Sequence, residues 1–141
     1  MENPISITQA TIHQGSIAVL QNVNLQVSEG EFVYLIGRTG SGKSSLLKTL
    51  YGELKLQEGR IDIAGYDLES IVPKDVPFLR RKLGIVFQDF QLLTDRNVLD
   101  NLMFVLSATG WKNKHEMLDR CKAVLEKVGL QTKDYKIPAE L

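Results

Sequence analysis

Gly37-Arg-Thr-Gly-Ser-Gly-Lys43-Ser44 is the stretch that decides the fold of this sequence. It satisfies the pattern Gly-x-x-x-x-Gly-Lys-[Ser/Thr], which is typical of a phosphate-binding loop. Glycine lets the backbone wrap closely and turn its N–H groups toward an anion at a helix N-terminus. Lys43 can then reach the β- and γ-phosphates, and the Ser44 hydroxyl is a hard oxygen ligand suited to Mg²⁺. The stretch predicts a site for a nucleoside triphosphate.

The residues on either side of this loop support that interpretation. Phe32-Val-Tyr-Leu-Ile36 is a short apolar run, which indicates a strand buried on both faces. After the loop, the spacing predicts a helix that ends at Gly52 and has one apolar face, made of Leu46, Leu47, Leu50 and Tyr51. The alternative, a glycine-rich turn with no ligand, explains this strand and helix less well.

The rest of the chain predicts strands first and helices later. Apolar residues at period two indicate strands framed by Ile5 and Ile12 and over 20–27, and a half-exposed strand over 59–65. Gly84-Ile-Val-Phe-Gln88 is predicted to be a second buried strand. Short helical patterns follow over 78–82, from a cap at Thr94 or Asp95 to Thr109, and over 114–128, where Cys121 lies on the apolar face.

Composition excludes several classes of protein. The 141 residues are enough for one modest domain, with 43% apolar and 24% charged residues. Lys+Arg and Asp+Glu both number 17, so nothing indicates a nucleic-acid partner. No apolar run approaches the roughly 20 residues that span a bilayer, and the N-terminus has no signal-peptide pattern. A single cysteine excludes an internal disulfide and favours a reducing compartment.

The order of the motifs resembles that of ABC-transporter ATP-binding domains. The matching stretches are 20–25, Glu29-Gly-Glu31, the phosphate-binding loop, 45–47, Glu58-Gly-Arg-Ile61 and 83–88. Within that family, Phe78 to Val98 is similar to the cell-division (FtsE) branch. The resemblance implies an α/β fold: a P-loop NTPase (RecA-like) core with an ABC-type antiparallel β subdomain and the beginning of a helical subdomain. It also implies two regions, a nucleotide-binding half over 1–96 and the start of the helical subdomain over 97–141.

The same resemblance implies how ATP and Mg²⁺ are held. Gln88 matches the glutamine of the family that approaches Mg²⁺ and the γ-phosphate, so the metal is expected at Ser44 and Gln88; a carboxamide oxygen can ligate a hard cation without adding charge. His13 stands where the family places an aromatic residue against adenine, although an exposed residue at a strand end is the alternative. The nucleotide-binding residues are then His13 and the loop residues Gly37, Arg38, Thr39, Gly40, Ser41, Gly42, Lys43, Ser44 and Ser45.

The expected partners also follow from the resemblance. Members of the family receive an integral membrane subunit, here FtsX-like, on the region after Gln88. Candidates to line a groove there are Phe90, Leu92, Leu93 and Met103, and core packing is the alternative for these four residues. A second ATP-binding subunit is expected in a head-to-tail dimer, at the cytoplasmic face of a bacterial inner membrane. Trp111 is interpreted as a packing anchor.

Several elements of an ATPase are not recognisable in the sequence. We find no signature loop, no apolar strand that ends in Asp-Glu after Gln88, and no switch histidine, so no catalytic residue is assigned. The chain resembles a truncated domain that ends just before the signature loop, and hydrolysis is expected only in a full-length dimer. Lipoprotein-release or macrolide-export ATPases and a non-hydrolysing nucleotide-binding module are the alternatives. A small kinase or GTPase lacks support, because neither lid arginines nor an Asn-Lys-x-Asp motif is present.

Overall fold

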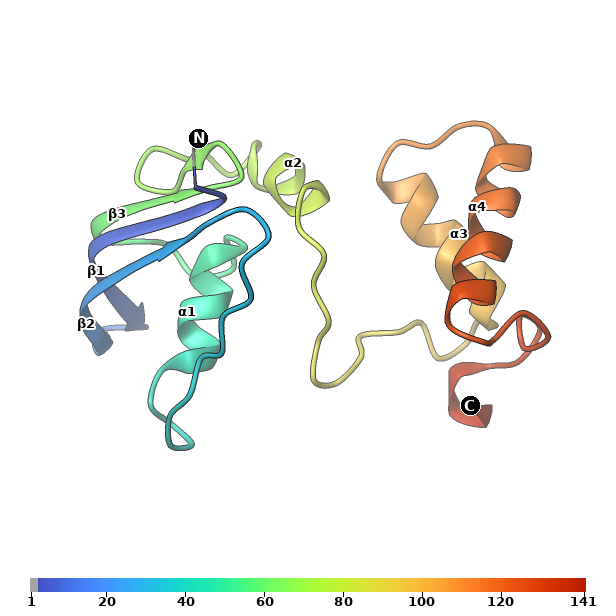
Figure 1. The fold of residues 1–141 in the computed structure, drawn as a ribbon, viewed down its shortest axis with the longest axis horizontal. Helices are drawn as coiled ribbons and strands as arrows, with labels where there is room; N and C mark the ends of the chain where they lie inside the picture. The colour runs from blue at the N-terminus through green and yellow to red at the C-terminus, as the bar shows by residue number, and fades with distance from the viewer. Residues whose placement is uncertain (1–2) are drawn as a thin grey trace. The chain divides into compact units, whose positions relative to one another are not determined.

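Two long antiparallel strands begin the structure. In the computed structural model, which describes residues 3–141, β1 runs over Ile5–Gln14 and β2 over Ile17–Val27. β3 (Glu58–Ile63) pairs with the other edge of β1, and β4 (Tyr66–Asp67) extends the sheet. The order β2-β1-β3-β4 is antiparallel throughout, and Figure 1 labels the three longer strands β1, β2 and β3. The prediction of an antiparallel β subdomain is confirmed.

A close approach between β1 and β3 fixes how these two strands meet. Their register shifts between Thr8 and Thr11, where Gln9 takes a left-handed backbone with φ +47°. Gly59, with φ +81°, lies so close to this bulge that a Cβ atom there would overlap the Gln9 carbonyl oxygen. Only glycine fits such a position, because any side chain would overlap the neighbouring backbone.

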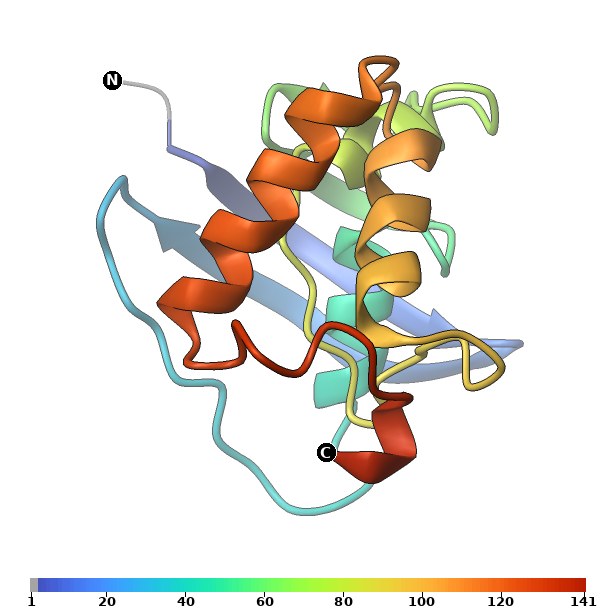
Figure 2. The same cartoon turned by 90° about the vertical axis from the view of Figure 1, so that its right-hand side faces the viewer.

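The helix α1 (Lys43–Leu50) covers one face of this sheet (Figures 1 and 2). Its Leu46 and Leu50 are buried among strand residues, whereas Leu47 is 53% exposed, so the predicted apolar face is narrower than expected. The shared core combines residues of α1, of β1 and β3 with their four isoleucines, of the connecting loops and of the next helix: Ile7, Ala10, Ile12, Leu46, Leu50, Leu56, Ile61, Ile63, Leu68 and Leu79.

A second short helix, α2 (Val76–Arg81), is tied to the end of α1. Leu79 is fully buried in the shared core. Arg80 donates hydrogen bonds to the carbonyl oxygens of Tyr51 (2.9 Å) and Gly52 (3.3 Å), just after the last residue of α1. A guanidinium is favourable there because the carbonyl end of a helix carries partial negative charge.

Two predicted strands are wrong. Neither 32–36 nor 84–88 is a strand in the structure, and Phe32, Ile36 and Val86 are 77%, 89% and 94% exposed. A strand needs a hydrogen-bonded neighbour. Within residues 3–141 the one sheet is the antiparallel sheet described above, and neither segment joins it.

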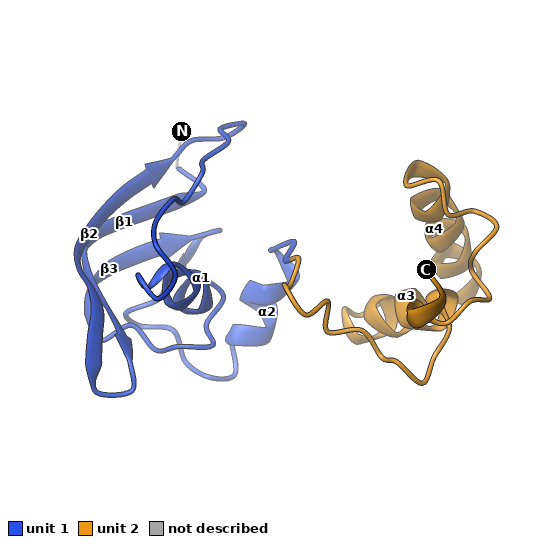
Figure 3. Ribbon diagram, turned by 90° about the horizontal axis from the view of Figure 1, so that it is seen from below, with its two compact units in different colours: residues 1–85 blue, residues 86–141 orange. Residues whose placement is uncertain are grey.

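The C-terminal part of the chain is helical and forms its own compact unit. The structure divides into unit 1 (Met1–Ile85) and unit 2 (Val86–Leu141), coloured separately in Figure 3. Unit 2 pairs α3 (Val98–Ala108) with α4 (Lys114–Lys127) and ends in the short 3₁₀ helix η1 (Pro138–Glu140). Between residues 3 and 141, no helix is long and apolar enough to cross a membrane.

The caps of α3 differ from the prediction. Asn97, and neither Thr94 nor Asp95, caps the helix, and its side chain accepts a hydrogen bond from the Asp100 N–H. The first two N–H groups of α3 donate to the carbonyl oxygens of Lys136 (2.8 Å) and Asp134 (2.9 Å). Backbone from the end of unit 2 therefore satisfies donors that a helix start leaves unpaired.

The helix α4 agrees closely with its predicted pattern. Met117, Cys121 and Leu125 are buried, whereas Val128 is 62% exposed beyond the helix end. Burial raises the pKa of the Cys121 thiol, so it stays protonated at neutral pH and is a poor nucleophile. The interpretation of Cys121 as a packing residue agrees with this burial.

We predict that Gly59→Ala destabilises the chain far more than Gly15→Ala. Both glycines have positive φ, but a Cβ at Gly15 meets nothing within 4 Å. The Gly15 variant should cost about 1 kcal/mol through backbone strain alone. The Gly59 variant should cost about 3 kcal/mol, because it also separates β1 from β3. Urea unfolding followed by far-UV circular dichroism measures both, and equal midpoints would contradict the close approach.

Candidate phosphate-binding site

The loop from Gly37 to Gly42 begins the candidate site. Gly40 and Gly42 have φ values of +80° and +90°, a backbone conformation that residues other than glycine rarely adopt. Gly42 is the residue before α1, and its carbonyl oxygen accepts the N–H of Leu46 at 2.9 Å. A Cβ at Gly42 would also lie 2.7 Å from Cγ of Leu20 in β2. Backbone conformation and packing therefore both require glycine here.

Lys43 closes the loop from inside. Its Nζ donates to the carbonyl oxygens of Gly37 and Arg38, both at 2.7 Å, and to the Ser41 hydroxyl at 3.4 Å. These contacts hold the ammonium group against the loop at the N-terminus of α1, the end of a helix that favours anions. The predicted lysine, glycines and helix N-terminus therefore lie together.

The two serines that follow have different surroundings. Ser44 is exposed and so is open to a ligand, whereas Ser45 is buried and its carbonyl oxygen accepts the Thr49 hydroxyl at 2.9 Å. The Ser45 side chain thus belongs to the interior of unit 1. Arg38 and Thr39 are exposed at the tip of the loop. Among residues 3–141, no cluster of three or more His, Cys, Asp or Glu side chains is placed to hold a metal ion.

His13 lies on β1 and faces Ala18 of β2. The next pair in this ladder joins Ile12 to Leu20, the residue that packs against Gly42. The His13 ring is half-buried, and its Nδ1 atom is buried with no hydrogen-bond partner among the described residues. The β1–β2 hairpin thus carries His13 on the same strand pair that supports the loop.

Gln88 belongs to unit 2, and its side chain is exposed. Ser44 belongs to unit 1, and the structure describes the two units separately. The shared metal site of Ser44 and Gln88 stays a prediction. After Gln88 the chain turns sharply, with left-handed backbone at Phe90 (φ +59°) and Gln91 (φ +47°).

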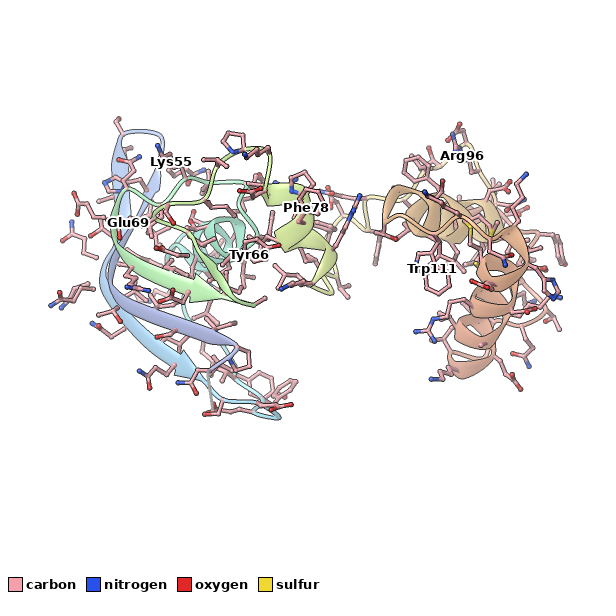
Figure 4. The ribbon with its side chains drawn as sticks, turned by 90° about the horizontal axis from the view of Figure 1, so that it is seen from above. Lys55, Tyr66, Glu69, Phe78, Arg96 and Trp111 are labelled. Carbon is pink, nitrogen blue, oxygen red and sulfur yellow. The ribbon has the colours of Figure 1, made fainter. Side chains whose placement is uncertain are left out.

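Unit 2 also contains a groove of about 510 Å³ along α3. Four of its lining residues are charged and four are apolar. Arg96 and Trp111, labelled in Figure 4, lie in the sequence just before and just after α3. The Arg96 guanidinium lies 5.2 Å from the centre of the Phe104 ring. The lining residues are Arg96, Asp100, Met103, Phe104, Ser107, Trp111, Lys112, Lys114 and Met117.

The groove differs in part from the residues that the sequence indicated. Met103 lines it, but Phe90, Leu92 and Leu93 do not. Trp111, interpreted as a packing anchor, is 41% exposed at the groove. Lys112 and Lys114 were not singled out from the sequence. Their closeness in the sequence to Trp111 is a signal that could have indicated a charged groove.

Together, the glycine loop, its lysine and the helix that follows define a P-loop domain. The chain belongs to the ABC transporter family, whose family model matches residues 20–141. It is similar to the cell division ATP-binding protein FtsE of Streptococcus pneumoniae, at 38% identity over 92% of this chain and 56% of that protein. It is also 39% identical to FtsE of Escherichia coli, over 90% of this chain and 57% of that protein.

Solved structures agree with this assignment. The ATP-binding cassette MJ0796, a dimer in a post-hydrolysis state bound to ADP and Pi, has a TM-score of 0.84 and 30% identity. The match covers 97% of this chain and 62% of MJ0796. CbiO1 of Clostridium perfringens, part of the ABC transporter complex CbiONQ, has a TM-score of 0.85 at 24% identity, over all of this chain and 56% of cbiO1. This second likeness shows the fold alone, and the chain spans little more than half the length of the curated relatives.

Proposed function

We propose that this chain is the ATP-binding part of a membrane-associated ABC complex of the cell-division, FtsE-like type. The observation that carries the proposal is the position of Lys43, whose Nζ lies 2.7 Å from two loop carbonyls at the N-terminus of α1. A cation fixed there, beside backbone N–H groups, favours a polyphosphate over any neutral ligand. Hydrolysis is proposed only for the full-length dimer.

ATP and Mg²⁺ are the proposed ligands. The loop residues would hold the phosphates, His13 would stack on the adenine, and the Ser44 hydroxyl and the Gln88 carboxamide would ligate the metal. The likeness to a cassette bound to ADP and Pi supports the nucleotide, and the exposed Ser44 hydroxyl supports the metal. A lipoprotein-release or drug-export ATPase is the second candidate, since the family is shared.

We expect Lys43→Met to weaken ATP binding by about tenfold or more, because the charge-assisted bonds to phosphate are lost. Lys48→Met is the matched control. Lys48 lies on the same helix, and its ammonium contacts Glu53 at 2.8 Å on an exposed surface, so its loss should change the affinity by less than about twofold. Titration with a fluorescent ATP analogue in the presence of Mg²⁺ measures both. Unchanged affinity after Lys43→Met would refute the proposed site.

A second expectation separates the adenine from the phosphates. His13→Tyr should strengthen ATP binding by a factor of about two to ten, because a phenol ring offers a larger stacking face. His13→Ala should weaken it. Neither change should alter the affinity for inorganic triphosphate, which has no base. If both variants bind ATP as the unaltered chain does, His13 is an ordinary residue at a strand end.

The proposed partner is an FtsX-like integral membrane subunit that contacts unit 2 after Gln88, together with a second ATP-binding subunit, at the cytoplasmic face of a bacterial inner membrane. The groove along α3 supports this partner, because Met103, Phe104 and Trp111 offer an apolar surface. Arg96, Lys112 and Lys114 outnumber the one carboxylate at its rim, Asp100, so a segment with acidic residues fits best.

We expect Trp111→Ala to lower the affinity for the membrane subunit by about tenfold, since exposed tryptophan often dominates an interface. Tyr135→Ala is the control, because Tyr135 is a 70% exposed aromatic residue of the same unit that does not line the groove. Copurification with the detergent-solubilised subunit compares the two variants. Trp111 is the only tryptophan in the chain, so its fluorescence reports binding by the unaltered chain and by Tyr135→Ala. Equal losses in both variants would argue against the groove.

A further inference from the structure

Asn101 is a buried amide whose hydrogen bonds all go to one short segment of backbone. Only 9% of the residue is exposed, on the side of α3 near its N-terminus. Its Oδ1 accepts the Leu93 N–H at 2.8 Å. Its Nδ2 donates to the carbonyl oxygens of Leu93 (2.9 Å), Arg96 (3.2 Å) and Asn97 (2.9 Å). Acceptor and donors of this side chain are thus both fully used.

These bonds fix the segment from Leu93 to Asn97, which has little else to hold it. Thr94, Asp95 and Arg96 are exposed, and the segment is neither helix nor strand. One backbone bond within it, from the Arg96 N–H to the Leu93 carbonyl, measures 3.3 Å. The segment ends where Asn97 caps α3. Asn101 therefore determines the path of the chain directly before the helix.

The segment from Leu93 to Asn97 also forms one rim of the groove, because it contains the lining residue Arg96. The Arg96 guanidinium lies 5.2 Å from the Phe104 ring at the groove surface. A cation over an aromatic face gains little at an exposed site, so this contact alone cannot order a loop. Backbone fixed by Asn101 places the Arg96 side chain at the groove before any partner arrives.

We propose that Asn101 is the positioning residue that preforms this rim, so that the partner docks on an ordered surface. This inference rests on the proposed function, because it concerns the membrane subunit assigned to the groove. A preordered surface binds more tightly, since the entropy of ordering the loop is not lost on binding. Asparagine suits the position because it accepts one N–H and donates to carbonyls at once, which neither aspartate nor leucine can do.

Hydrogen exchange on the unaltered chain is the first test. The Leu93 N–H donates to a buried acceptor, whereas the Thr94 and Asp95 N–H groups have no bond to any residue within 3–141. The Leu93 amide should exchange about tenfold more slowly than the other two. Equal exchange at all three amides would overturn the proposal without any variant.

Asn101→Asp is the second test, with Asn97→Asp as its matched control. The same chemical change removes all donors at Asn101 and sets a carboxylate against three carbonyl oxygens. At Asn97 it keeps the acceptor that caps α3. Only Asn101→Asp should lose the protection of the Leu93 amide and about tenfold in affinity for the detergent-solubilised FtsX-like subunit. Asn101→Ser, which keeps one short donor, serves if the aspartate variant does not fold.

The outcomes separate the two proposals. Failure of the unaltered chain to bind the membrane subunit would overturn the proposed partner. Binding by the unaltered chain that Asn101→Asp and Asn101→Ser leave unchanged would overturn the role of Asn101. Loss of binding in Asn97→Asp to the same extent would also overturn it, because the cap and not the amide would then order the rim.

Discussion

The left-handed backbone at Gly42 is the constraint on which the candidate site depends. With φ at +90° and a leucine of β2 directly beside it, this position accepts no side chain. The same residue directly precedes α1, so the direction of the helix, the position of Lys43 at its first turn and the packing of α1 on the sheet are set together. Because Leu20 belongs to β2, the register of the β1–β2 pair also decides where the loop lies.

Much of this could be predicted from the sequence. The phosphate-binding loop has a combination of residue types that few other structures require. The period-two pattern of β1, β2 and β3 follows from a sheet with one buried face. The helix α4 was predicted within a residue of its end, because Met117, Cys121 and Leu125 repeat at helical spacing and Gly129 follows. In these cases local pattern and tertiary packing agree.

Other features had no local signal. Phe32 to Ile36 has the composition of a buried strand, but a strand is decided by a hydrogen-bonded neighbour that composition does not reveal. The cap of α3 was misplaced because Thr94, Asp95 and Asn97 are all good caps. The residue that selects Asn97 is Asn101. Its side chain donates hydrogen bonds to the carbonyl oxygens of Leu93 and Arg96, and so keeps residues 94–96 out of the helix. The groove was partly missed for a similar reason, since its lining comes from both helices and from the loop between them.

The hydrogen bonds between residues 134–136 and the start of α3 have a consequence for how the sequence can vary. Lys136 and Asp134 reach the first N–H groups of α3 through their carbonyl oxygens, which every amino acid possesses. The side chains at these two positions can therefore be substituted in evolution while both hydrogen bonds are kept. The number of residues between α4 and Asp134 is constrained, because one insertion or deletion would move both carbonyl oxygens away from the N–H groups of α3. Related sequences should keep this spacing, although the amino acids at the two positions vary.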